Sequence, residues 1–288
     1  MQYLELPENR IRGPIPDVFG GMTQLKYLDF SYNALTGPLP ESIALCPRFQ
    51  QLIAINNQLT GPIPASYPGL AGLRVLSIKV NMLTGTIPAF LGSLPLLANL
   101  ILSYNRFTGT LPKELGLLPL AHLILYENHL HGHIPVEYSN ITTLTELYLG
   151  HNKLSGHVPP AFAQSSFLDF YVDENMLSGP IDFIASLTNA VGIDLTSNRF
   201  TGTIPDSIGE LNLLNIILLQ DNQLHGTIPA SLAALTNLTY VYLNQNELSG
   251  TVPDLVASAA QLQYFYVSDN LLTGTIPVNI GTLVHLLE

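Results

Sequence analysis

An asparagine that recurs at a nearly constant interval is the feature that most restricts the fold of this chain. It stands at positions 9, 33, 57, 81, 105, 128, 152, 175, 198, 222, 246 and 270, in steps of 23 or 24 residues. The surrounding residues recur as well: residues 105–118 read NRFTGTLPKELGLL and residues 198–211 read NRFTGTIPDSIGEL. A period of this length is typical of a solenoid, in which each repeat is one structural unit.

The shared frame is LxxLxLxxNxLxGxIPxxLGxLxx, and each part predicts a local structure. The segment LxxLxL alternates apolar and variable residues, as a strand with one buried face does. Strands separated by 23 or 24 residues cannot be joined as hairpins, so we expect a stacked parallel sheet. The asparagine follows the strand, and we expect its amide to point inward and to bond backbone groups that the turn leaves unpaired.

The second half of the frame predicts how the chain returns to the start of the next strand. Its glycine permits close packing or an unusual backbone angle, and the proline of IP prevents a helix or sheet from continuing. The segment LGxL predicts a short helical turn with two inward side chains. No repeat buries its apolar face alone, so neighbouring repeats must cover it.

The frame resembles the plant-type leucine-rich repeat. That family includes ectodomains of receptor-like kinases and secreted inhibitors of pectin-degrading enzymes, and similar repeats occur in surface antigens of some protists. The resemblance implies an α/β fold: a right-handed solenoid of horseshoe form, with a parallel sheet on its concave side and a short second sheet from the GxIP segment. We therefore expect about 12 repeats of 23–24 residues in a single domain over residues 1–288.

The sequence departs from the family frame at several points. Ile181–Asp182 replaces Ile-Pro in repeat eight, and Ala54 replaces an inward leucine in repeat three. The cysteine-containing caps usual in the family are missing, since Met1 opens a repeat and Leu286 starts another. We expect the chain to be a fragment that lacks both caps, so the missing secretion signal carries no information about where the protein is located.

Charge and cysteine content exclude several classes of function. The net charge is −11, and residues 127–288 contain fifteen Asp/Glu against two Lys/Arg. A chain with this negative charge repels phosphate backbones and anionic lipids. We therefore expect no nucleic-acid partner and no membrane contact by this segment. Cys46 is the only cysteine, which excludes an intrachain disulfide and a cysteine-rich metal site.

Partner-binding residues are expected at strand positions that the core does not need, mainly positions three and five of the repeat. Eleven of the thirteen tyrosines, all but Tyr67 and Tyr138, fall at exposed strand positions. We predict an apolar stripe and, further along the chain, a tyrosine cluster with two aliphatic neighbours. The stripe comprises Ile53, Ile101, Ile124, Tyr148 and Tyr171, and the cluster Tyr240, Tyr242, Tyr264, Tyr266, Ile216 and Leu218. Contiguous exposed apolar surface usually marks a binding site, although such residues also simply favour strands.

Acidic residues accompany the stripe at variable positions: Glu127, Glu146, Asp169, Asp173, Glu174, Asp194 and Asp221. Clustered negative charge attracts a basic partner, and its alternative role is a solvated face. We expect repeats six to ten to bind a protein or peptide that carries Lys or Arg next to an apolar group.

Catalysis and metal binding are weighed against the same residues. Glu146 and Asp169 stand at one position of adjacent strands, about 4.8 Å apart, a spacing near that of the carboxyl pair of retaining glycosidases. An open sheet, however, offers no water-excluding pocket that would raise one pKa, so we expect no enzyme activity. His129, His131 and His133 alternate near His157, but no carboxylate stands at a fitting spacing, so we expect neither a metal site nor a cofactor.

Two N-x-Thr sequons predict glycosylation at Asn140 and Asn237. Together with the resemblance, these features predict a non-enzymatic protein or peptide recognition module, the extracellular ligand-binding part of a receptor-like or cell-surface protein. The expected location is extracellular or at the cell surface, and a full-length receptor would be membrane-anchored. A secreted inhibitor of a hydrolase, similar to polygalacturonase inhibitors, and a glycan- or ice-binding surface protein remain open alternatives.

Overall fold

The computed structural model describes residues 1–254, 261–278, 280 and 285–287. The chain forms two compact units: the first comprises Met1–Leu144 with His151–Lys153, and the second Thr145–Gly150 with Leu154–Glu288. Each unit is a stack of coils that share one design. A coil contains a strand of a main sheet, a short strand of a second sheet and, in ten of the repeats described, a 3-10 turn.

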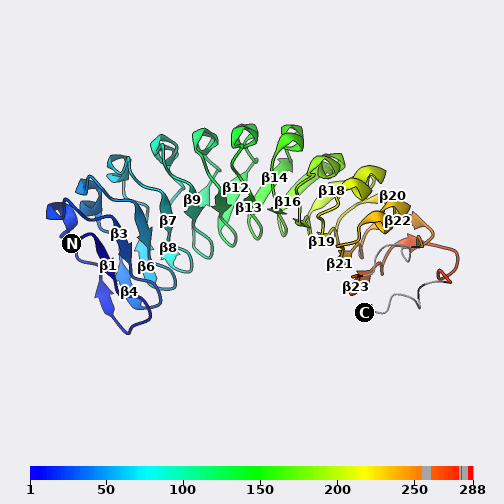
Figure 1. Cartoon of the computed structure of the whole chain (residues 1–288), viewed down its shortest axis with the longest axis horizontal. Helices are drawn as coiled ribbons and strands as arrows, with labels where there is room; N and C mark the ends of the chain where they lie inside the picture. The colour runs from blue at the N-terminus through cyan, green and yellow to red at the C-terminus, as the bar shows by residue number, and fades with distance from the viewer. Residues whose placement is uncertain (255–260, 279, 281–284, 288) are drawn as a thin grey trace. The chain divides into compact units, whose positions relative to one another are not determined.

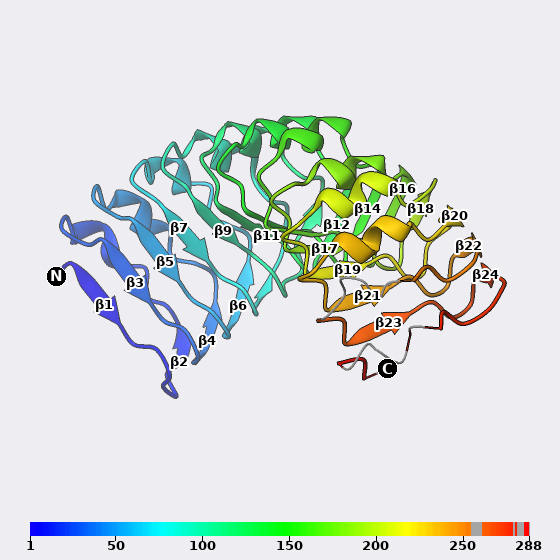
Figure 2. The ribbon, with the colours of Figure 1, turned by 45° about the vertical axis from the view of Figure 1, so that its right-hand side comes forward.

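The main sheet is parallel, and its strands follow chain order in each unit (Figure 2). In the first unit the strands are β1 (Tyr3–Glu5), β3 (Tyr27–Asp29), β5 (Gln51–Ile53), β7 (Val75–Ser77), β9 (Asn99–Ile101) and β11 (His122–Ile124). In the second unit they are β13 (Glu146–Tyr148), β15 (Asp169–Tyr171), β17 (Gly192–Asp194), β19 (Ile216–Leu218), β21 (Tyr240–Tyr242) and β23 (Tyr264–Tyr266). Equivalent repeat positions pair directly, as Leu4 with Leu28, which confirms the predicted stacking.

The second sheet is made of shorter parallel pieces. They are β2 (Arg12–Pro14), β4 (Ala34–Gly37), β6 (Gln58–Gly61), β8 (Met82–Leu83), β10 (Thr108–Gly109), β12 (His129–Gly132), β14 (Lys153–His157), β16 (Met176–Pro180), β18 (Arg199–Thr201), β20 (His225–Thr227), β22 (Glu247–Gly250) and β24 (Leu271–Leu272). Each piece ends two to five residues before the frame position of the IP proline, which has no N–H for a ladder.

Short 3-10 turns close the coils. They are η1 (Phe19–Gly21), η2 (Glu41–Leu45), η3 (Tyr67–Gly69), η4 (Ala89–Ser93), η5 (Lys113–Leu117), η6 (Val136–Asn140), η7 (Pro160–Gln164), η8 (Asp182–Ser186), η9 (Asp206–Glu210) and η10 (Ala230–Ala234). Within each unit they lie across the coil from the main-sheet strands (Figure 1). None of the helical segments in the described ranges has the length and apolarity needed to cross a bilayer.

The core lies between the sheet and the turns of each coil. Tyr67 and Tyr138 are fully buried, and their hydroxyls donate to the carbonyls of Pro40 and Pro112 at 3.3 and 3.1 Å. Cys46 is also buried, and burial raises the pKa of its thiol. The Cys46 thiol and the two phenols thus each donate to a backbone carbonyl.

The recurring asparagines form the predicted internal ladder. Asn105 is representative: its Nδ2 donates to Ile78 O in the preceding repeat and to Leu102 O in its own, both at 3.0 Å. Its Oδ1 accepts the N–H of Leu83 at 3.0 Å. The same Oδ1 bond to the preceding repeat recurs from Asn33 to Asn270 at 2.8–3.0 Å. Each amide from Asn33 to Asn270 therefore joins two coils.

The residue before each ladder asparagine has a left-handed backbone, which the sequence pattern did not predict. The twelve residues have φ between 44° and 57°, and none of them is glycine. Val80, with φ 57°, is β-branched and is therefore under the greatest steric strain. The frame glycine has φ between 75° and 89°, which confirms its predicted role.

A second glycine of the frame allows neighbouring turns to approach closely. A Cβ atom on Gly116 in η5 would lie 2.5 Å from the carbonyl oxygen of Glu137 in η6. The two departures from the frame are accommodated locally. Ala54 is fully buried. Asp182 stands at the position of the frame proline, and η8 starts at this residue, whereas η2 and η9 start one residue after the proline.

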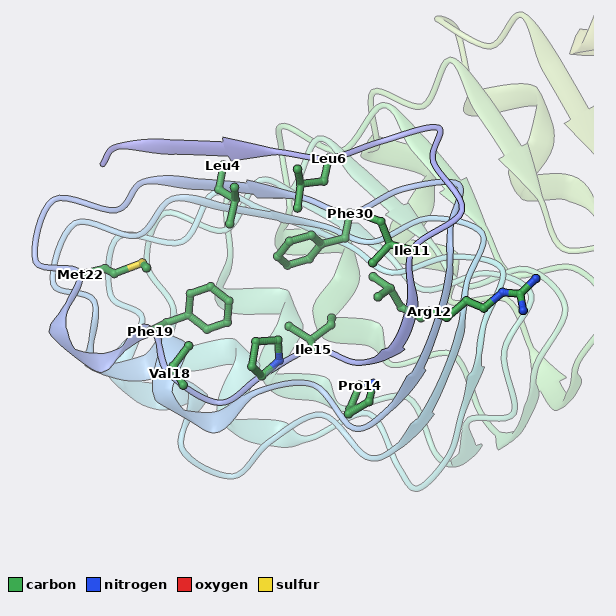
Figure 3. A pocket seen from close by; sticks show the side chains of 12 residues that line it. Leu4, Leu6, Ile11, Arg12, Pro14, Ile15, Val18, Phe19, Met22 and Phe30 are labelled. Carbon is green, nitrogen blue, oxygen red and sulfur yellow. The ribbon is translucent and has the colours of Figure 1, made fainter.

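An apolar pocket lies at the first repeat (Figure 3). The pocket is lined by side chains from β1, from η1 and from the turn that follows β3, including Leu4, Leu6, Phe19 and Phe30. The side chain of Arg12 points away from the others in Figure 3. The pocket exposes core side chains of the coil that contains β1, the first strand in the sheet order.

Candidate recognition surface

The main sheet brings the predicted partner-binding residues into two columns on one face of the second unit. Position three places Glu146, Asp169, Gly192, Ile216, Tyr240 and Tyr264 side by side in successive strands. Position five does the same for Tyr148, Tyr171, Asp194, Leu218, Tyr242 and Tyr266. All of them except Gly192 are partly exposed, so they line a face that the core does not use.

Two tyrosines and one carboxylate form the most ordered part of this face. The rings of Tyr148 and Tyr171 stack with their centroids 4.8 Å apart and their planes at 14°. The Tyr148 hydroxyl donates to Oδ2 of Asp169 at 3.0 Å, and the Tyr171 hydroxyl donates to Oδ1 at 3.3 Å. Both carboxylate oxygens are thus oriented by phenols, and the group presents a fixed negative charge beside an aromatic surface.

A glycine in the next strand makes room for this network. A Cβ atom on Gly192 would lie 2.7 Å from Oδ1 of Asp169 and would also collide with the Tyr171 hydroxyl. Because Gly192 has no side chain, Tyr171 and Asp169 cover its backbone, and Gly192 itself is buried. The arrangement of the carboxylate therefore depends on a residue in the neighbouring repeat.

The two hydroxyls of the network resist ionisation. Desolvation by burial raises the pKa of Tyr148 and of Tyr171 well above the ordinary value, and the charge and hydrogen bonds of Asp169 add to the effect. Both phenols consequently remain hydrogen-bond donors at neutral and mildly alkaline pH.

Asp173 is not on the exposed face, contrary to the sequence-based expectation. Only 7% of its surface is exposed. It fills the space above Gly150, where a Cβ atom would lie 2.7 Å from its Cγ. Because Gly150 has no side chain, the Asp173 side chain of the following repeat can pack against its backbone.

The other acidic residues divide between strand and turn. Glu146 and Asp194 lie in main-sheet strands, and Oδ1 of Asp194 accepts the N–H of Thr196 at 2.9 Å. Glu127, Glu174 and Asp221 lie beyond the strands, at the left-handed residue before the asparagine, and all three are exposed. These last three extend the negative charge past the strand ends rather than along the strands, which corrects the predicted placement.

The predicted tyrosine cluster is present. Tyr240 and Tyr264 stack at 5.1 Å with their planes at 7°, and Tyr242 lies 4.6 Å from Tyr266. Contacts of 6.5 and 6.4 Å within each strand close the two-by-two arrangement. Ile216 and Leu218 pair with Tyr240 and Tyr242, as expected. We call these four tyrosines the tyrosine block.

The predicted apolar stripe is interrupted in the first unit. Ile101 and Ile124 are neighbours in paired strands, but Ser77 separates Ile53 from Ile101. Ser77 is buried, so the apolar surface of Ile53 does not continue to Ile101. Sequence reasoning also overlooked a row in this unit: Tyr104 contacts Tyr126 at 5.5 Å, and Tyr126 contacts His151 at 4.7 Å.

The remaining candidates lie elsewhere. Among the described residues, no three His, Cys, Asp or Glu side chains converge in a way that could hold a metal ion. His129, His131, His133 and His157 are exposed in or next to β12 and β14 of the second sheet. Asn140 and Asn237 are both exposed, and the Asn237 side chain donates to Asn212 O at 2.8 Å.

Comparison with known proteins identifies the family. Profiles of the leucine rich repeat match residues 1–59 and, separately, residues 96–118, 143–165, 191–211 and 261–283. The chain is a leucine-rich repeat protein. Its repeats follow the plant-type frame, and the solved structures that it resembles include ectodomains of plant receptor kinases. A comparison with curated protein sequences gives no significant match.

Three solved leucine-rich-repeat relatives illustrate the similarity. A TDR receptor has 28% identity and a TM-score of 0.89, over 99% of this chain and 54% of that chain. The Arabidopsis receptor kinase HAESA, solved with the peptide hormone IDA and a co-receptor, has 30% identity and a TM-score of 0.85, over 99% and 52%. A plant ice-binding protein has 29% identity and a TM-score of 0.73, over 84% and 79%. The leucine-rich-repeat chain thus spans about half the length of the two receptors.

Proposed function

We propose that this leucine-rich-repeat chain is a non-enzymatic recognition module that binds a basic protein or peptide on the main-sheet face of its second unit. The observation that carries the proposal is the doubly hydrogen-bonded carboxylate of Asp169 beside the stacked rings of Tyr148 and Tyr171. A guanidinium or ammonium group can pair with such a carboxylate while its aliphatic stem packs on the rings.

The charge around this carboxylate favours a cationic ligand. The exposed or half-exposed acidic residues on this face or just beyond its strand ends are Glu146, Glu174, Asp194, Asp221 and Asp269. After residue 127 the only Lys/Arg are Lys153 and Arg199, and they lie in β14 and β18 of the second sheet. The face therefore has a one-signed field, which should steer a basic partner and make association depend on salt.

The structural neighbours support a ligand-binding role. One of them is the Arabidopsis receptor kinase HAESA, solved in complex with the peptide hormone IDA, and another is PEPR1, solved with AtPEP1. By analogy, this chain belongs to the extracellular part of a receptor-like or cell-surface protein. A hydrolase inhibitor and a glycan-binding surface protein would use the same kind of face, and the chemical class of the ligand separates them.

A binding titration tests the proposal. The chain is titrated calorimetrically with short peptides that carry Arg next to an apolar residue, at several salt concentrations. We expect D169N and E146Q to weaken binding about tenfold each and to flatten the salt dependence. The matched control is D206N, which removes an exposed carboxylate of the same unit in η9, outside the main sheet. Equal affinities for D169N, E146Q, D206N and the unmodified chain would refute the basic-ligand site.

A further inference from the structure

The tyrosine block differs from the Tyr148–Tyr171 pair in how its hydroxyls are used. Tyr148 and Tyr171 both donate to Asp169. The hydroxyls of Tyr240 and Tyr264, by contrast, make no hydrogen bond to any residue in the described ranges, and both side chains are partly exposed. Two phenolic donors are therefore available to an external acceptor at the block.

The packing of the rings determines what shape fits them. Because Tyr240 and Tyr264 stack nearly parallel at 5.1 Å, each covers part of the other's face. The pair consequently presents ring edges and hydroxyl tips, with the aliphatic side chains of Ile216 and Leu218 beside it (Figure 2 shows β19, β21 and β23 side by side). This surface suits small apolar rings attached to a chain of hydrogen-bond acceptors.

We propose that the tyrosine block binds a proline-rich segment in the polyproline II conformation, which names the ligand class within the proposed function. A polyproline II helix makes no internal hydrogen bonds, so its carbonyls can accept the hydroxyls of Tyr240 and Tyr264. It advances about 9.3 Å per turn of three residues, and two strand spacings of the sheet are about 9.6 Å. Prolines three residues apart can thus contact side chains two strands apart, such as Ile216 in β19 and Tyr264 in β23. Aromatic surfaces recognise this preformed helix at low entropic cost.

Charge complementarity favours the same occupant with basic flanks. The chain contains no Lys or Arg after Arg199, whereas Asp221 and Asp269 are exposed at the strand ends next to the block. A glycan is the alternative class that the test must exclude. Sugar rings stack on free aromatic faces, and the mutual stacking of Tyr240 and Tyr264 covers part of one face of each ring.

The experiment uses the whole chain and a capped, uncharged oligoproline peptide, with titration followed by calorimetry. We expect binding, and roughly 2- to 10-fold weaker binding for Y240F and for Y264F, because each variant loses one hydrogen bond but keeps its ring. The matched control is Y3F, at position three of the first unit, which should bind oligoproline unchanged. A peptide of equal length with alternate prolines replaced by alanine should bind more weakly.

Three results would overturn the inference. They are no binding of oligoproline, equal binding of the alanine-interrupted peptide, and binding of a cello-oligosaccharide that Y240A abolishes while oligoproline gives no signal. Because the probe is uncharged, its affinity should not change with salt concentration, whereas the affinity of the basic peptide should fall as salt is added. A failure of the basic-ligand proposal is thereby distinguished from a failure at the tyrosine block.

Discussion

Replacement of a ladder asparagine by alanine tests how the coils are held together. In Asn105→Ala the Leu83 N–H loses its acceptor, and the Ile78 carbonyl loses one of its two amide donors and keeps that of Asn81. Leu83 and Ile78 are fully buried, so bulk water does not replace the amide. One buried N–H donor is then left unpaired in the centre of the first unit.

The size of the effect follows from the unpaired Leu83 N–H. A buried donor without a partner costs about 1–3 kcal/mol, so Asn105→Ala should lower the free energy of unfolding by about 2 kcal/mol. For a chain of this size that corresponds to a fall in Tm of roughly 4–8 °C. The Leu83 amide should also exchange with solvent roughly thirtyfold faster.

Asn9→Ala is the matched control, since Asn9 has the same place in the frame but bonds only within its own repeat, to Leu6 O and Pro7 O. It is also exposed, so its replacement should cost less than about 1 kcal/mol. Urea unfolding followed by circular dichroism gives the stabilities, and hydrogen-exchange mass spectrometry of the peptide containing Leu83 gives the local effect. Equal losses for Asn9→Ala and Asn105→Ala would refute the reasoning that the ladder stabilises the fold by joining repeats.

Three further changes probe other parts of the structure. Gly116→Ala should destabilise by about 1–3 kcal/mol in urea unfolding, because the new Cβ meets Glu137 O at 2.5 Å. Val80→Asn should stabilise by about 1 kcal/mol in the same assay, because Asn tolerates the left-handed backbone of φ 57°. The raised pKa of Tyr171 gives stability that is fully present below about pH 10, the unfolded value, and is lost as pH rises through the folded value. Asp169→Asn should lower that pKa, as measured by ultraviolet titration of tyrosinate, and should reduce the alkaline loss of stability.

Each of these changes has a control or a contradicting result. Gly21→Ala should be nearly neutral, because a Cβ atom on Gly21 would meet nothing within 4 Å. The left-handed position before the asparagine is already occupied by an asparagine in repeat three, Asn56, so a destabilised Val80→Asn variant would contradict the strain argument. An unchanged tyrosinate titration in Asp169→Asn would show that the carboxylate does not influence the phenols.

The stack of coils was predictable because the frame states the same constraint twelve times. Each leucine, glycine and asparagine could be assigned a role from its period alone, and equal repeat lengths fix which residues pair, as Tyr240 with Tyr264. The left-handed residue escaped notice because the residues that occupy it, among them Glu8, Val80 and Ser197, share no side-chain chemistry. It is required by the chain path, and the path is a property of the stack.

The finer structure of the recognition surface could not be read from single repeats. Asp173 is buried because the adjacent repeat has Gly150, and Asp169 is oriented because the adjacent repeat on the other side has Gly192. The sequence indicates this only when the same position is compared between adjacent repeats. A glycine in one repeat then leaves space for the acidic or aromatic side chain of its neighbour. The break in the apolar stripe has a similar origin, since Ser77 stands in the same column as the isoleucines.

The central claim is that the main-sheet face of the second unit receives the ligand. The most direct test is a chemical footprint of the tyrosines, by limited iodination and mass spectrometry, with and without a bound basic, proline-rich peptide. We expect the peptide to protect Tyr148, Tyr171, Tyr240 and Tyr264 and to leave Tyr3 and Tyr104 of the first unit as reactive as before. Protection of Tyr3 and Tyr104 without protection of the other four would place the ligand elsewhere and contradict the claim.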